Sequence, residues 1–228
     1  MVNNKKKRNI FADKATLVLR KMLSCPEKKW VTRDFIGPEG LSIGMAQGVL
    51  EAMATGGYIE WSKHGPASYA LLTNREKLIS DWLAVYQFQL NEVDTYYSPD
   101  KNILSKLKNY LKDKQYALTI HSGANLITSF VITDHIYLYF KSKNWNKDIL
   151  DFRQKLDLKE LVRGGNIHII RPYYENSIFF NEQTIKGYKV VSNLQLYLDL
   201  YNFQPRGQEQ AEQLKTILEE KGKNFYGS

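Results

Sequence analysis

The chain has 228 residues, and its 32 Lys and Arg against 24 Asp and Glu give a formal net charge of +8. Hydrophobic residues make up 43% of the chain, whereas 14 residues are Gly and 6 are Pro, a balance that predicts a globular protein and excludes collagen-like and globally disordered chains. The longest apolar runs fall far short of the roughly 20 residues that cross a bilayer, and the charged start lacks the apolar core of a secretory signal. We therefore expect a cytoplasmic protein without a membrane partner.

The excess positive charge is concentrated near the N-terminus. Residues 1–75 contain 12 basic and 6 acidic residues, whereas the remainder contains 20 and 18. Such a basic segment attracts phosphate groups through counterion release, which makes nucleic acid the first partner to consider. Charge alone does not distinguish a nucleic-acid-binding segment from a lysine-rich face that only keeps the chain in solution.

The spacing of apolar residues in this segment favours a DNA-binding unit. The predicted elements, in chain order, are a helix over 10–24, an extended piece at 30–31, a short helix over 33–36 capped by Thr32, a turn at 37–40, a helix over 43–55 capped by Ser42, and a hairpin of 58–61 and 68–72. Three helices followed by a hairpin is the order of a winged helix-turn-helix, whose third helix enters the major groove. We assign this unit to residues 1–75, with a winged helix used only for protein contact as the alternative.

The candidate DNA contacts follow from that assignment. The third helix has no Arg or Lys, so it lacks the commonest guanine contact, but Gln47 can pair with adenine. Its two glycines, Gly44 and Gly48, permit close approach either to the duplex or to the first helix. Phosphate contacts fall to side chains outside that helix and to the tail residues 5–8. The predicted DNA-binding residues are Lys28, Lys29, Arg33, Ser42, Met45, Gln47, Gly48, Lys63 and His64.

The rest of the chain predicts a connector and a second domain. An aromatic-rich helical stripe over 75–90 and a polar loop over 91–102 indicate a connector, 76–102, followed by a domain over 103–228. In that domain we expect helices over 103–111, 122–127, 146–156, 192–200 and 208–221, and strands over 116–120, 136–140, 166–170, 177–180 and 189–191. The fold class is therefore α+β, a winged helix-turn-helix followed by a mixed α/β domain.

The C-terminal run from 190 to 214 has the most distinctive polar pattern. Gln195 and Asp199 precede a Pro-Arg-Gly turn, and Arg206 and Glu209 follow. We expect Arg206 to lie between Asp199 and Glu209, either as a buried ion pair that fixes how two helices cross or as a charged site.

Together these segments resemble a known family. The winged helix, the run 116–119 leading into Ser122-Gly123-Ala124, the strands 136–140 and 166–170, and above all the run 192–214 are similar to AbiEi-type antitoxins of type IV toxin-antitoxin systems. The resemblance covers nearly the whole chain. It implies a DNA-binding repressor of its own promoter that counters a cognate nucleotidyltransferase-type toxin without forming a stable complex with it.

Catalysis has no support in the motifs. The chain has no phosphate-binding loop, no zinc-protease helix motif and no nucleophile elbow. Its one cysteine, Cys25, has no Cys or His neighbour for a zinc site, and its four histidines are scattered. We thus predict no catalytic residues, no metal and no cofactor. The alternative is a metal-dependent nuclease-like second domain targeted by the winged helix, with Asp134, Asp199, Glu209 and Glu212 as its carboxylates.

Overall fold

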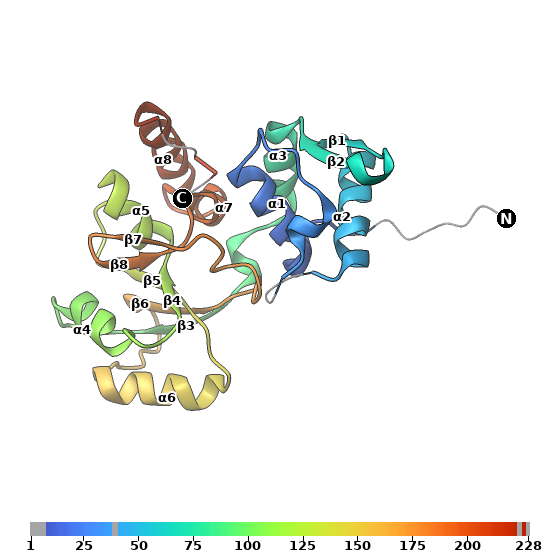
Figure 1. The fold of residues 1–228 in the computed structure, drawn as a ribbon. Helices are drawn as coiled ribbons and strands as arrows, with labels where there is room; N and C mark the ends of the chain where they lie inside the picture. The colour runs from blue at the N-terminus through green and yellow to red at the C-terminus, as the bar shows by residue number, and fades with distance from the viewer. Residues whose placement is uncertain (1–7, 38–40, 223–224, 227–228) are drawn as a thin grey trace. The chain divides into compact units, whose positions relative to one another are not determined.

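The structure of the chain, a computed structural model, describes residues 8–37, 41–222 and 225–226. The tail residues 5–7 and most of the predicted turn at 37–40 lie outside this part of the chain. The chain forms two compact units that meet in the sequence between Tyr86 and Gln87. Each combines helices with strands (Figure 1), so the predicted α+β class is confirmed. Within the described residues, every helix is too short or too polar to cross a bilayer.

The first unit consists of helices and one hairpin. Its elements are α1 (Asp13–Ser24), the 3-10 turn η1 (Thr32–Phe35), α2 (Ile43–Thr55), the antiparallel strands β1 (Ile59–Ser62) and β2 (Tyr69–Leu72) with the turn η2 (Gly65–Ala67) between them, and α3 (Arg75–Val85). The helices form because apolar residues recur at helical spacing and bury one face. Leu19, Met22, Leu50, Met53 and Trp82 are fully buried and form the core of this unit.

The two predicted helix caps in this unit have different outcomes. The Ser42 Oγ accepts a hydrogen bond from the backbone N–H of Met45, as expected for the N-cap of α2. The prediction for Thr32 is wrong, because Thr32 is already the first residue of η1. Instead, Val31 occupies the N-cap position of η1, and its backbone N–H donates a hydrogen bond to the Asp34 carboxylate at 3.0 Å.

The second unit is built on a six-stranded mixed sheet with the order β3-β6-β5-β4-β8-β7. The strands are β3 (Glu92–Tyr96), β4 (Tyr116–Leu118), β5 (Ile136–Phe140), β6 (Ile167–Arg171), β7 (Gln183–Ile185) and β8 (Tyr188–Val190). The pairs β5–β6 and β4–β8 are parallel, and the other neighbours are antiparallel.

Helices cover both faces of this sheet (Figure 1). The helices α4 (Ile103–Tyr110) and α6 (Trp145–Leu156) lie on one face, and α5 (Ile120–Thr128), α7 (Asn193–Tyr201) and α8 (Gly207–Glu220) lie on the other. Side chains alternate between the two faces along β5, because successive residues of a strand point in opposite directions. Tyr139 hydrogen-bonds to Asp199 of α7, whereas Phe140 packs edge-on against Phe152 of α6.

Two predicted segments differ from the structure. The polar segment 91–102 contains β3, because its backbone pairs with β6 along five residues, and the expected connector 76–102 is therefore divided, with α3 in the first unit and β3 in the second. The predicted strand 177–180 is instead a series of turns, in which the backbone N–H groups of Ser177 and Ile178 donate to the carbonyl of Tyr174.

Candidate nucleic-acid interface

A polar hollow separates α2 from the hairpin of the first unit. It has a volume of about 510 Å³ and is lined by Thr32, Gln47, Glu51, Trp61, Lys63, Gly65 and Ser68. The structure thus brings together Gln47 and Lys63, which are predicted contacts far apart in the sequence. The hollow is open, and its lining offers hydrogen-bond donors as well as acceptors.

The exposed face of α2 carries few side chains. Gln47 and Glu51 are exposed one helical turn apart, and a Cβ atom added at Gly44 would meet nothing within 4 Å. A Cβ atom at Gly48 would meet the guanidinium of Arg8, with Nε at 2.8 Å. Gly44 therefore does not pack against α1, and the nearest side chain at Gly48 is that of Arg8. The face of α2 around Gly44 is open to an approaching partner.

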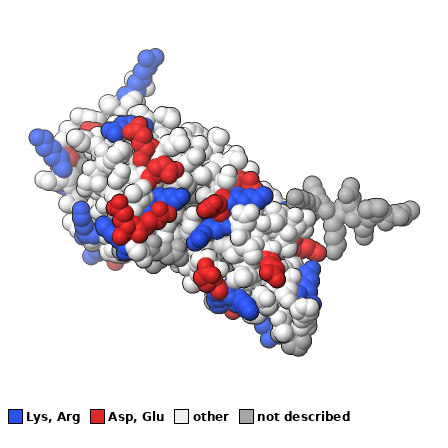
Figure 2. All heavy atoms as spheres, turned by 90° about the horizontal axis from the view of Figure 1, so that it is seen from above, with Lys and Arg blue, Asp and Glu red and all other residues white. Residues whose placement is uncertain are grey.

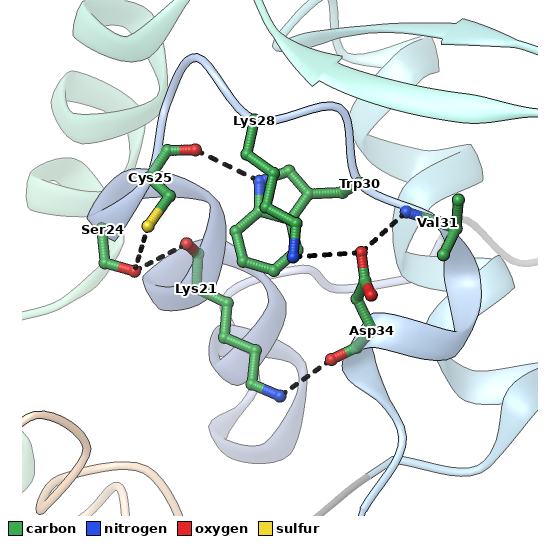
Figure 3. Close-up of polar contacts among 7 residues, drawn as sticks. All are labelled: Lys21, Ser24, Cys25, Lys28, Trp30, Val31 and Asp34. Carbon is green, nitrogen blue, oxygen red and sulfur yellow. Dashed lines mark hydrogen bonds and ion pairs between the residues drawn. The ribbon is translucent and has the colours of Figure 1, made fainter.

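Three predicted lysines lie over aromatic rings. The Nζ atom of Lys28 is 4.1 Å from the ring centre of Trp30, that of Lys29 is 4.5 Å from Tyr69, and that of Lys63 is 4.1 Å from Trp61. Such cation–π contacts orient a lysine without neutralising its charge. Figure 3 shows that Lys28 also reaches the Asp34 carboxylate, at 3.4 Å, which offsets part of its charge.

The remaining predicted contacts have mixed surroundings. Arg33 on η1 and His64 before η2 are exposed, whereas Met45 is half-buried. The Ser42 Oγ already accepts a hydrogen bond from the backbone N–H of Met45. Thr32, Glu51, Trp61 and Ser68 line the hollow and are absent from the predicted set. Glu51 lies four residues after Gln47 and so shares its helix face, a signal present in the sequence. The other three depend on how the hairpin packs.

The charged surface is mixed on the face drawn in Figure 2, where acidic and basic side chains alternate and no area of one sign dominates. The overall excess of +8 therefore forms no continuous basic patch on this face. Local placement of cations, and not a broad field, has to carry any interaction with phosphate there.

In the second unit, the predicted C-terminal motif divides into a buried part and an exposed part. Asp199 is fully buried, and its carboxylate accepts hydrogen bonds from Thr119 Oγ1 at 2.5 Å, Gln195 Nε2 at 2.7 Å and Tyr139 Oη at 3.1 Å. These donors come from the end of β4, from β5 and from α7 itself. The cluster therefore holds α7 against the sheet.

Arg206 does not pair with Asp199, so the predicted buried clamp is wrong. Its side chain is 52% exposed and its Nε donates to Glu209 at 3.1 Å, while its guanidinium lies 4.8 Å from the ring centre of Phe130. The reason is that Asp199 points into the sheet, away from the turn before α8. Gln210 makes the internal link instead, with Oε1 at His121 Nδ1 and Nε2 donating to Asn125 and Thr128 of α5.

The four carboxylates considered for a nuclease have separate neighbours, and Asp134 lies 4.0 Å from Nε2 of His135. Asp199 belongs to the buried cluster, Glu209 pairs with Arg206, and Glu212 accepts from the hydroxyl of Tyr197 at 3.0 Å. In the described ranges, His, Cys, Asp and Glu form no group of three that could hold a metal ion.

These features define a two-unit α+β protein. In its first unit, the exposed face of α2 lies beside the β1–β2 hairpin that bears Lys63. The chain belongs to the family described as transcriptional regulator, AbiEi antitoxin, type IV toxin-antitoxin system, whose model matches residues 71–220. This match covers α3 and nearly all of the second unit. Comparisons with curated proteins and with solved structures give no match.

Proposed function

We propose that this protein is a DNA-binding repressor of its own promoter and that residues 1–75 form a winged helix-turn-helix. The observation that carries the proposal is the polar hollow between α2 and the hairpin, with Gln47 on the helix and Lys63 on the hairpin. In a winged helix-turn-helix, one helix enters the major groove and the hairpin touches the flanking DNA backbone. The backbone then passes between the helix and the hairpin, and a concave junction at this place accommodates it. Lys28, Lys29 and Arg33 add cations on the neighbouring turn.

The second part of the proposal concerns the toxin. Family membership rests on residues 71–220, so we assign antitoxin activity to the second unit, directed against a nucleotidyltransferase-type toxin without a stable complex. The buried polar cluster around Asp199 gives that unit a fixed architecture, and the family is described as a transcriptional regulator and antitoxin. We therefore propose a regulator and not an enzyme.

Electrophoretic mobility shifts test DNA binding. The purified chain should shift the duplex upstream of its own gene more strongly than a shuffled duplex of equal length, and the affinity should fall steeply as salt rises. Replacing Lys28, Lys29, Arg33 and Lys63 by Ala should abolish the shift. A full shift by that variant, or no shift by the natural chain, would contradict the proposal.

A further inference from the structure

The open face of α2 has a cation that its own sequence does not provide. α2 contains no Lys or Arg, yet the Arg8 side chain crosses it at Gly48, where the position of a Cβ atom would lie 2.8 Å from Nε and 3.2 Å from Cζ. Arg8 is itself exposed. Glycine at position 48 thus leaves the space in which the guanidinium lies against the helix backbone.

The helix geometry places Arg8 and Lys63 at opposite edges of this face. Gln47 borders the hollow that Lys63 lines, and Gly48 lies about 100° further round the helix. Gly44 and Glu51 fall between Gln47 and Gly48 on the same projection. The exposed face therefore has a cation at each edge, Arg8 on one side and Lys63 on the other. Gly44, Gln47 and Glu51 lie between these two cations.

We propose that Arg8 binds a DNA phosphate on the side of the major groove opposite the phosphate that Lys63 binds, so that α2 lies between two backbones. This inference rests on the proposed DNA binding. The two edges of a helix in the major groove face the two phosphate backbones, while its centre faces base edges. In that orientation Gln47 meets an adenine edge and Glu51 accepts from a cytosine amino group.

A double-mutant cycle in the full chain tests this role. Arg8→Ala should weaken binding on the order of tenfold for the promoter and for a shuffled duplex alike, and it should reduce the slope of log affinity against log salt by about 1. Gly48→Ala removes no charge but displaces Arg8, so it should weaken binding to a similar degree. Once Arg8 is already Ala, Gly48→Ala should have little further effect. Lys155→Ala, which removes an exposed charge from α6, is the control and should leave binding unchanged.

Each other outcome overturns the inference. If the natural chain binds DNA and Arg8→Ala binds as tightly with the same salt slope, Arg8 makes no phosphate contact. If Arg8→Ala weakens only promoter binding, Arg8 reads a base and not a phosphate. If Gly48→Ala weakens binding equally with and without Arg8, the glycine serves close approach of the duplex itself. Failure of the natural chain to bind any duplex would instead contradict the proposed function.

Discussion

Two carboxylates in the same stretch of chain have very different surroundings. Asp199 accepts three hydrogen bonds in the core, whereas Glu209 is 60% exposed and pairs with Arg206. Asp199→Asn turns an acceptor into a donor facing other donors and should lower the free energy of unfolding by about 2 kcal/mol. The matched change Glu209→Gln should cost less than about 0.5 kcal/mol, because exposed ion pairs contribute little.

Urea denaturation of both variants, followed by circular dichroism, measures the difference. Equal losses would mean that the Asp199 cluster does not hold α7 to the sheet. Of the two partners predicted for Arg206, Glu209 is in contact with it and Asp199 is not. Helix spacing cannot indicate that Asp199 faces Thr119 and Tyr139, since these partners lie 80 and 60 positions away in the chain.

A histidine in the second unit should make stability depend on pH. Burial, and to a lesser extent the nearby His135, lowers the pKa of His168 to about 4. Its ring stacks on Tyr137, and its Nε2 lies 2.8 Å from Nδ1 of His135. In the unfolded chain the pKa of His168 is about 6.5, so the unfolded state binds more protons between these values. The contribution of neutral His168 is complete above about pH 6.5 and is lost as the pH falls towards 4.

We expect the melting temperature of the natural chain to fall between about pH 7 and pH 4.5, and His168→Phe to fall less over that interval. Thermal unfolding at several pH values measures both slopes. His64→Gln is the control, because His64 is exposed at the hairpin turn of the first unit. The same slope in all three proteins would show that His168 does not titrate with folding.

At the scale of elements, two glycines show where helices pack tightly and where a helix face is open. A Cβ atom at Gly207, the first residue of α8, would lie 2.3 Å from the carbonyl oxygen of Leu200 in α7. Gly207→Ala should therefore force the two helices apart and cost about 1–3 kcal/mol. Gly44→Ala in α2 meets nothing and should stabilise the chain by up to about 1 kcal/mol through helix propensity. Chemical denaturation of both variants checks the two signs, and destabilisation by Gly44→Ala would contradict the open face of α2.

The elements that the sequence predicts best are those with local signals. The serine cap of α2 is confirmed because the Ser42 hydroxyl satisfies a backbone N–H three residues later, within the same segment. The strand β3 was missed because it is an edge strand with mostly exposed side chains, so it lacks a clear alternation of buried residues. Ser177 to Phe180 has strand-forming residues, but hydrogen bonds to the preceding turn determine its backbone.

At the scale of the molecule, the proposed division of labour follows the two compact units. The candidate DNA-binding residues all lie before Tyr86, whereas the family match extends from the end of the hairpin through α8. The candidate DNA surface and the Asp199 cluster thus belong to different units and share no residue. We therefore expect DNA binding and toxin neutralisation to be separable by substitutions in the full chain.

The full-length variant with Lys28, Lys29, Arg33 and Lys63 replaced by Ala should lose repression of its own promoter and keep full protection against the co-expressed toxin. These four side chains are exposed, so the substitutions should leave the fold intact. A promoter fused to a reporter measures repression, and growth after toxin induction measures protection. Asp199→Asn provides the reciprocal variant, since it should weaken protection before it affects repression. Loss of protection in the quadruple variant, with an unchanged melting curve, would mean that the DNA surface itself takes part in countering the toxin.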